Sequence, residues 1–145
     1  MENMQIRRLK IEDAEEITRI YAAITRKPAS PDFKRVVEDH ARREDGACFV
    51  AEMNGQLVGF MISTILTAGF GMPKSAWIAT LGVSPDHMGQ GIGAAMAEEI
   101  FAFYHSHGIE NLYTAVRWDS TDMLSFFKTL GFDRSNFINL RKVLK

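Results

Sequence analysis

The chain has 145 residues and a single cysteine, and seventeen basic against eighteen acidic side chains leave a formal charge of −1. With 46% hydrophobic and 24% charged residues, this is the composition of one globular domain, which we expect to span residues 1–145. No global field would attract nucleic acid or a membrane surface, no apolar run reaches the ~18 residues of a membrane span, and residues 1–8 lack the apolar stretch of a signal peptide. A lone cysteine excludes an internal disulfide and a cysteine-based metal site. We therefore expect a soluble, cytoplasmic protein without a metal.

The first part of the sequence predicts a strand and two helices. Residues 4–8 alternate as a short strand, and Asp13 and Glu16 have the spacing of a helix capping box. Ser30-Pro31 is typical of a second helix start. Apolar residues at helical spacing predict the buried faces of these helices: Ala14, Ile17, Ile20, Tyr21 and Ile24 in the first, and Phe33, Val36, Val37 and His40 in the second.

The rest of the chain predicts alternating strands and helices. Asn54-Gly55 between apolar runs predicts a hairpin of strands 47–53 and 56–65, followed by a loop over 66–74. The remaining elements are a strand over 75–83, a helix over 91–107, a strand over 111–117, a helix from Asp119 or Ser120 to Leu130, and one or two strands within 132–143. Hairpin strands before a β-α-β unit indicate an α/β (α+β) fold with a mixed, mostly antiparallel sheet.

A glycine-rich turn carries the strongest chemical signal. Gly89, Gly91 and Gly93 follow the strand that ends at Val83 and open the next helix. Glycines let a ligand approach the main chain, and the unpaired N–H groups of a helix start favour an anion such as a phosphate. A flexible turn without a ligand is the alternative. The turn does not fit a P-loop, because Ala94 and the alanine after it stand where Lys and Ser/Thr are needed.

Two sequence blocks resemble the GNAT superfamily of acyl-CoA-dependent N-acyltransferases. One is Val-x-Pro-x-x-x-Gly-x-Gly-Ile-Gly over residues 83–93, and the other is Phe-Phe-Lys-Thr-Leu-Gly-Phe over residues 126–132, where the family commonly shows Tyr-x-x-x-Gly-Phe. The resemblance covers the whole chain in element order. It implies helices on both faces of the sheet, acetyl-CoA (coenzyme A) as cosubstrate without a metal, and direct transfer of acetyl to a primary amine of a small molecule or protein.

The resemblance also implies the residues of the site. Main-chain groups of Leu81 and Val83 would bind the pantetheine and the acetyl carbonyl, and the Val83 N–H would stabilise the oxyanion. The pyrophosphate would be held by the main-chain N–H groups of Met88, Gly89, Gln90, Gly91, Ile92, Gly93 and Ala94. The other side of the cofactor would be lined by Ser120, Met123, Phe126 and Phe127.

The sequence departs from the family pattern at the catalytic groups. Phe127 replaces the usual Tyr acid, residues 84–116 contain no Lys or Arg, and the strand before the glycine turn has no carboxylate. Three side chains are candidate general bases: Glu52, Asp119 and His87. Each also has a non-catalytic explanation, because Glu52 can be an exposed hairpin residue, Asp119 a helix cap and His87 a solvated loop residue. A water chain that ends at the main chain needs none of them.

Three functions therefore stand side by side. The first is acetyl transfer to an amine, the second is an acyl-CoA-binding sensor without turnover, and the third is an unrelated nucleotide-binding domain.

Several further side chains could contribute to the site. Tyr104 and Tyr113 are alternative acids, and Trp77 and Trp118 are substrate contacts or core residues. The cations of the second helix form a solvated face or a site for an acidic acceptor: Lys34, Arg35, Arg42 and Arg43. The partners are an amine acceptor and, as among relatives that pair through final strands, a second copy of the chain.

Overall fold

The computed structural model of the chain describes residues 3–67 and 73–145. It divides into two compact units, Met1–Thr114 and Ala115–Lys145, and each unit is described by itself. The predicted order of strands and helices is confirmed through the last helix. Most of the predicted loop over 66–74 lies outside the described residues, and the single domain over 1–145 stays a prediction.

A five-stranded sheet forms the frame of the first unit, in the order β1-β2-β3-β4-β5. Its strands are β1 (Met4–Arg8), β2 (Cys48–Met53), β3 (Gln56–Leu66), β4 (Ser75–Val83) and β5 (Leu112–Thr114). Neighbouring strands are antiparallel, except that β4 and β5 are parallel. Asn54 and Gly55 both have positive φ, at 54° and 83°, as the predicted hairpin turn requires. The mixed, mostly antiparallel sheet is therefore confirmed.

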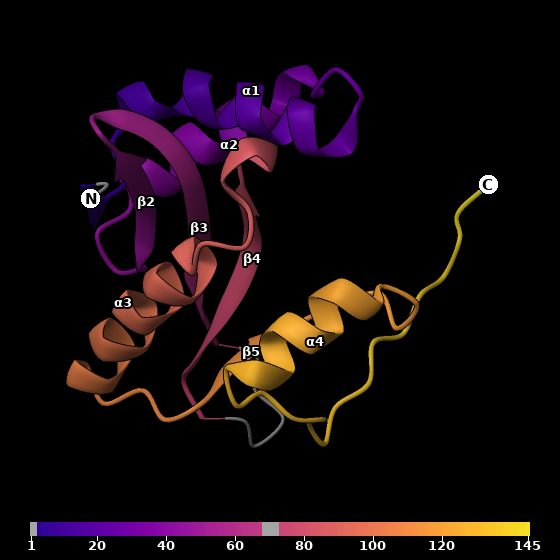
Figure 1. Ribbon diagram of the computed structural model, residues 1–145. Helices are drawn as coiled ribbons and strands as arrows, with labels where there is room; N and C mark the ends of the chain where they lie inside the picture. The colour runs from indigo at the N-terminus through magenta and orange to yellow at the C-terminus, as the bar shows by residue number, and fades with distance from the viewer. Residues whose placement is uncertain (1–2, 68–72) are drawn as a thin grey trace. The chain divides into compact units, whose positions relative to one another are not determined.

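Helices cover both faces of this sheet (Figure 1). Their bounds are α1 (Ala14–Thr25), α2 (Pro31–Arg42) and α3 (Ile92–Ser106). The apolar stripe predicted for α1 is confirmed, since Ile17 is fully buried in one cluster with Val37 of α2 and Phe60 of β3. On the opposite face α3 approaches so closely that a Cβ added to Gly59 would lie 3.1 Å from Cε of Met96.

The start of α1 differs from the predicted capping box. A short 3-10 helix, η1 (Ile11–Asp13), precedes it, and Asp13 is the third residue of that helix. Its carboxylate accepts the main-chain N–H of Lys10 at 2.8 Å and makes no cap for α1. Glu16 pairs with Arg19 instead. Asp13 does occupy the N-cap position of α1, as predicted, but the capping box with Glu16 was wrong, because the helical turn begins three residues earlier, at Ile11.

The second helix begins at the predicted residue, although the Ser30 hydroxyl makes no cap bond, and it exposes one expected core residue. Pro31 occupies the first helical position, Val37 is fully buried, and Phe33 stacks on Tyr21 with ring centroids 4.1 Å apart. Val36 is 47% exposed. Consecutive helical residues point about 100° apart, so Val36 lies on the flank of the helix while Val37 faces the sheet.

A buried polar cluster ties α3 to the sheet. The main-chain N–H of Ala47 donates to the hydroxyl oxygen of Tyr104 at 3.0 Å, and that oxygen lies 2.7 Å from the hydroxyl of Ser63. Ser63 also donates to the carbonyl of Ala47. Burial raises the pKa of Tyr104 above its ordinary value. The Tyr104 hydroxyl therefore satisfies buried main-chain and side-chain groups, which is a structural role.

The second unit contains the helix α4 (Thr121–Thr129) and a C-terminal segment. Phe127 is buried, with ring centroids 5.2 Å from Phe126 and 5.0 Å from Phe132. The final strands predicted within 132–143 are wrong, because no helix or strand is present over residues 132–145. Alternating apolar residues give β propensity, but a strand forms only where a neighbour completes its ladder. For the same reason β5 is shorter than the predicted strand 111–117.

Candidate functional site

The edge of β4 becomes open partway along the strand. β5 pairs with Ala76, Trp77 and Ile78 of β4 and no further, whereas β4 continues to Val83. At the last of these pairs the Thr114 hydroxyl donates to the carbonyl oxygen of Ile78 at 3.0 Å. Over residues 79–83, the open edge of β4, the described part of the chain provides a paired strand on the β3 side only.

The register of β3 and β4 shows which main-chain groups point to this open edge. Val83 lies opposite Gly59, and the N–H of Ser84 donates to the carbonyl of Val58 at 2.7 Å. In an antiparallel ladder, alternate residues direct their N–H and C=O groups toward the partner and away from it. Since Ser84 bonds toward β3, the groups of Val83 and Leu81 point away from β3. Two residues predicted to bind the cofactor thus present main-chain donors and acceptors at the open edge.

Gly82, between these two residues, marks a very close contact with α1. A Cβ added there would lie 2.7 Å from Cδ1 of Ile24 and 2.9 Å from Cε1 and Cζ of Phe60. The last turn of α1 therefore lies directly over the strand segment that carries Leu81 and Val83. Gly82 was not among the residues predicted from the sequence, although a glycine inside a strand is a recognised signal of close approach.

The glycine turn follows β4 through a short 3-10 helix, η2 (Pro85–His87). Gly89 and Gly91 both have φ of 80°, and a Cβ on either would meet nothing within 4 Å. The first hydrogen bond of α3 runs from the N–H of Ala95 to the carbonyl of Gly91, and no side chain caps the helix start. The N–H groups of the first turn are therefore available to an anion, at a turn whose residues 88–91 are exposed.

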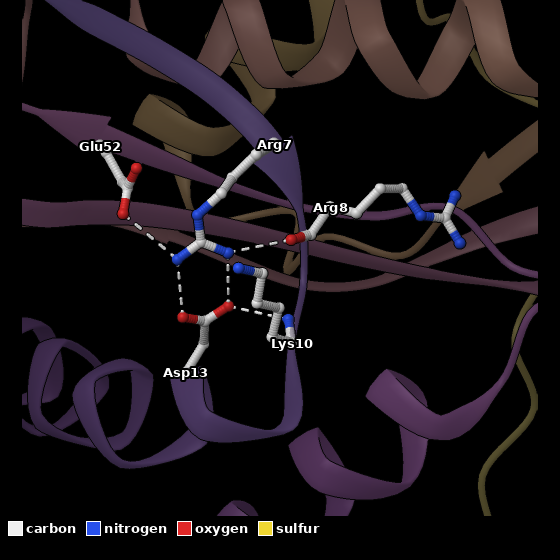
Figure 2. A network of polar contacts seen from close by, with 5 residues as sticks. All are labelled: Arg7, Arg8, Lys10, Asp13 and Glu52. Carbon is white, nitrogen blue, oxygen red and sulfur yellow. Dashed lines mark hydrogen bonds and ion pairs between the residues drawn. The ribbon is translucent and has the colours of Figure 1, made fainter. Parts of the chain in front are cut away.

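The candidate base Glu52 belongs to a network around Arg7 of β1 (Figure 2). Two guanidinium nitrogens of Arg7 donate to the two carboxylate oxygens of Asp13 at 2.8 Å each, and one of them lies 3.3 Å from Oε2 of Glu52. Burial opposes ionisation of Asp13, but the Arg7 hydrogen bonds and the Lys10 N–H outweigh it, so the pKa of Asp13 lies below its ordinary value. Oε1 of Glu52 accepts no hydrogen bond from the described residues.

Glu52 lies on the α1 side of the sheet but two strands away from Val83. The row Ala51–Gly59–Val83 crosses β2, β3 and β4, and Glu52 follows Ala51 directly. Two strand spacings amount to about 10 Å, which is too far for a direct hydrogen bond to a group at Val83. One or more waters would have to connect Glu52 to an amine bound there.

In the second unit, Asp119 is exposed and bound by Arg117. Two oxygens of Asp119 accept hydrogen bonds from this guanidinium at 3.0 and 2.9 Å. The Arg117 bonds hold the pKa of Asp119 below its ordinary value, which makes this carboxylate a weaker base. Ser120 is at the N-cap position of α4 without a side-chain cap bond. Trp118 is 89% exposed and is not a core residue of this unit.

The remaining site candidates divide between the two units. Met123 and Phe126 are half-buried on α4, and the buried ring of Phe127 has no proton to donate. In the first unit, His87 of η2 is half-buried, and its Nδ1 is shielded from solvent without a hydrogen-bond partner in the described residues. This differs from the solvated loop histidine that we considered.

No group of three or more His, Cys, Asp or Glu residues within 3–67 and 73–145 could hold a metal ion. No helix in these ranges has the length and apolar character of a membrane span.

Residues 14–132 match the model of the Acetyltransferase (GNAT) family. Similar solved structures include the aminoglycoside N-acetyltransferase AAC(6')-Iy in complex with CoA, at 16% identity and a TM-score of 0.82 over 99% of this chain and 96% of that one. The aminoglycoside acetyltransferase meta-AAC0020 from an uncultured soil metagenomic sample has 21% identity and a TM-score of 0.79, over 98% and 97%. A ribosomal-protein-alanine N-acetyltransferase from Brucella melitensis biovar Abortus 2308 has 17% identity and a TM-score of 0.78, over 99% and 100%.

At these identities the solved structures establish the fold, and the family model establishes membership. The match covers most of the chain, including the glycine turn and the Gly131-Phe132 ending. The first unit supplies the open edge of β4 and the uncapped start of α3. The chain belongs to the acetyltransferase (GNAT) family and is an acetyl-CoA-dependent N-acetyltransferase.

Proposed function

We propose that acetyl-CoA lies along the open edge of β4, with its diphosphate at the start of α3. The observation that carries this proposal is the end of the β4–β5 ladder at Ile78, after which Leu81 and Val83 turn their main-chain groups outward. An extended pantetheine arm has amides that can pair with such an edge, in the way that a peptide adds to a sheet. The related AAC(6')-Iy structure is a complex with CoA, which supports the same cofactor.

The diphosphate would be bound by main-chain N–H groups between Met88 and Ala94. Gly89 and Gly91 support this role, because their positive φ and open surroundings let an anion approach the backbone. The neighbouring N–H groups lack a side-chain cap, and the helix dipole favours negative charge there. Since residues 84–116 contain no Lys or Arg, the binding at this turn would use neutral donors.

In the reaction we propose, the amine nitrogen attacks the thioester carbonyl carbon and forms a tetrahedral intermediate. The N–H of Val83 stabilises the oxyanion, since it points to the open edge of β4. The carbon–sulfur bond then breaks and coenzyme A leaves as a thiolate. Phe127 cannot supply a proton to that thiolate, and the Tyr104 hydroxyl is engaged with Ala47 and Ser63. We therefore propose that water donates the proton that the thiolate takes up.

Glu52 and Asp119 are the two carboxylates proposed to take the proton from the amine. Both are bound by an arginine, but Glu52 keeps one oxygen without a hydrogen bond in the described residues, whereas Arg117 engages both oxygens of Asp119. Glu52 is therefore the better candidate and would act through water. The test is the pH dependence of kcat/KM in Glu52→Gln and Asp119→Asn. If Glu52 is the base, the fall of kcat/KM at low pH should disappear in Glu52→Gln. If the profile is unchanged in both variants, solvent takes the proton from the amine.

The α4 residues remain part of the proposal. Ser120, Met123, Phe126 and Phe127 would line the second side of the cofactor, and their support is the match of this segment to the family pattern. The acceptor would be a small-molecule or peptide amine, as in two proteins of similar structure, an aminoglycoside N-acetyltransferase and a ribosomal-protein-alanine N-acetyltransferase. A homodimer and a cytoplasmic location stay predictions from the sequence.

Gly91→Val and Gly93→Val test the cofactor site. A side chain at either position would crowd the N–H groups at the start of α3, so acetyl-CoA binding should be lost. Gly108→Val is the matched control, because Gly108 also has a positive φ, 75°, with open space around it, but lies beyond the other end of α3. We expect Gly91→Val and Gly108→Val to lower Tm by similar amounts. Acetyl-CoA binding should be lost in Gly91→Val and Gly93→Val and kept in Gly108→Val.

The measurement is the change in Tm with acetyl-CoA, ATP or NAD, since a ligand that binds only the folded state raises apparent stability. Stabilisation by acetyl-CoA alone agrees with the proposal, and stabilisation by ATP or NAD would favour a general nucleotide site. Folded Gly91→Val and Gly93→Val proteins that bind acetyl-CoA as tightly as the parent would refute the proposed diphosphate site. Thiol release over a panel of amines then measures transfer.

A further inference from the structure

The loop after α1 carries two cations close to the proposed reaction centre. Ile24 contacts the strand at Gly82, between the two residues whose main-chain groups face the open edge. Arg26 and Lys27 follow within three residues, and three extended residues span at most about 11 Å. Neither cation has an ion-pair or hydrogen-bond partner for its side chain within residues 3–67 and 73–145. Their charges are therefore available to a ligand.

The backbone holds Arg26 in a conformation that a glycine would adopt more easily. Arg26 ends α1 in the left-handed region, with φ of 58° and ψ of 31°. This position usually carries glycine, because a Cβ is unfavourable there. The Thr25 hydroxyl lies 3.0 Å from the carbonyl oxygen of Tyr21 and 3.3 Å from that of Lys27, which fixes the course of the loop. A long cationic side chain at a strained helix end indicates a function for that side chain.

Carboxylates are scarce around the same part of the sheet. The sequence from Gln56 to Val83, which contains β3 and β4, has no Asp or Glu and a single cation, Lys74. On α2, Asp32 pairs with Arg35 at 3.6 Å, and Glu38 is half-buried farther along the helix. Two other carboxylates are to be counted: Glu52 is bound by Arg7, and Asp86 is exposed in η2, three residues beyond Val83. β3 and β4 themselves therefore offer no carboxylate to a positively charged acceptor.

We propose that the amine acceptor also carries a carboxylate, and that Arg26 and Lys27 bind this carboxylate. The inference rests on the proposed function, because it places the acceptor between α1 and the open edge of β4. An amine with several positive charges would find no cluster of carboxylates on β3 or β4 and would be repelled by the loop. An anionic acceptor is attracted by both cations, and Arg26 can bind it in a bidentate manner.

Three probe amines of equal chain length separate the possibilities: 4-aminobutyrate, butylamine and 1,4-diaminobutane. Their far ends are negative, neutral and positive, while their reacting amines are alike. We expect kcat/KM for thiol release to fall in that order. In the double variant Arg26→Gln/Lys27→Gln, kcat/KM for 4-aminobutyrate should fall about tenfold, the effect of two exposed ion pairs, while that for butylamine stays unchanged.

Two further variants separate charge recognition from structure. Arg42→Gln removes a cation at the far end of α2, where Arg42 pairs with Asp39, and should leave the order of the three amines unchanged. Arg26→Gly should keep or raise Tm, since glycine suits the left-handed helix end, yet lower kcat/KM for 4-aminobutyrate. A purely structural role for Arg26 would not produce this combination.

The outcomes also separate this inference from the function on which it rests. Thiol release that favours 1,4-diaminobutane, or a preference for 4-aminobutyrate that survives in Arg26→Gln/Lys27→Gln, overturns the inference and leaves the transfer reaction intact. Absence of release with all three probes, with an aminoglycoside and with the free amino acids, in a protein that acetyl-CoA still stabilises, overturns the proposed reaction as well. A preference for 4-aminobutyrate that rising salt weakens supports the inference, because salt screens exposed charges.

Discussion

Gly82→Ala is a sharp test of how α1 is held over β4. The added Cβ would lie 2.7 Å from Cδ1 of Ile24 and 2.9 Å from two ring atoms of Phe60. Ile24 is partly buried and its terminal methyl can move, but Phe60 is fully buried and packs edge-on against Phe33 at a centroid distance of 6.5 Å. Overpacking of this kind costs about 1–3 kcal/mol, from which the lower entropy of the unfolded alanine variant removes up to about 1 kcal/mol.

We therefore expect Gly82→Ala to lose about 1–2 kcal/mol of unfolding free energy, or about 3–8 °C in Tm for a chain of this length. Urea unfolding gives the free energy, and an unchanged m-value would show that the denatured state is unaffected. If displacement of α1 disturbs the acceptor site, KM for the amine should rise more than KM for acetyl-CoA.

Gly59→Ala is the matched control on the opposite face of the sheet. Its Cβ would lie 3.1 Å from Cε of Met96, the end of a flexible side chain that adapts to its surroundings, and 3.3 Å from the carbonyl oxygen of Gly82 and Cγ2 of Ile92, contacts that need shifts of only about a few tenths of an ångström. We expect a loss below about 1 kcal/mol. A Gly82→Ala variant as stable as the parent, beside a clearly destabilised Gly59→Ala, would refute the packing argument.

The remaining predictions concern charge and buried polar groups. Acetyl-CoA affinity should fall only weakly between low and moderate salt, because residues 84–116 contain no cation; a steep fall would show that a distant cation holds the phosphates. Asp13→Asn should cost about 2 kcal/mol at pH 7, from its charge-assisted bonds. Because the pKa of Asp13 is lowered, this difference is full above the unfolded value of about 3.9 and vanishes as pH falls through the folded pKa. Urea titrations from pH 7 to pH 2 measure it, and a constant difference contradicts the ion pair. Tyr104→Phe should cost about 1–3 kcal/mol by leaving the buried N–H of Ala47 without an acceptor, and Tyr21→Phe, whose hydroxyl has no hydrogen-bond partner among residues 3–67 and 73–145, serves as the control.

The features that could be predicted from the sequence follow from local backbone rules. The hairpin turn at Asn54-Gly55 requires positive φ at both residues, and only a few residue pairs adopt it easily. The hairpin could therefore be predicted without tertiary information. The glycine turn was readable for the same reason, since Gly89 and Gly91 adopt φ of 80° before a helix. The strand over 75–83 had the correct bounds because an apolar β-rich run ends at Ser84-Pro85.

The features that could not be predicted depend on contacts between distant segments. Asp13 looked like a helix cap because a capping pattern says nothing of Arg7, which binds it from β1. Gly82 looked unremarkable until Ile24 and Phe60 were found against it. The strands predicted within residues 132–143 were wrong for a related reason: an apolar pattern cannot show whether a neighbouring strand is present to pair with it.

The proposed roles of the site residues imply an uneven use of charge. Main-chain groups of Leu81 and Val83, and the N–H groups of the glycine turn, are neutral donors and acceptors whose direction is set by the ladder and by the helix start. Such groups do not titrate, so binding of acetyl-CoA through them is insensitive to pH near neutrality. Charge enters at the acceptor side, where Arg26 and Lys27 lack partners in the described residues while Glu52 is already bound by Arg7. Because this arrangement gives an amine few carboxylates to raise its pKa or remove its proton, the acceptor itself becomes the main titrating group. Specificity would then depend on the second charge that the acceptor carries, which places selection in the loop after α1 and leaves cofactor binding to the backbone.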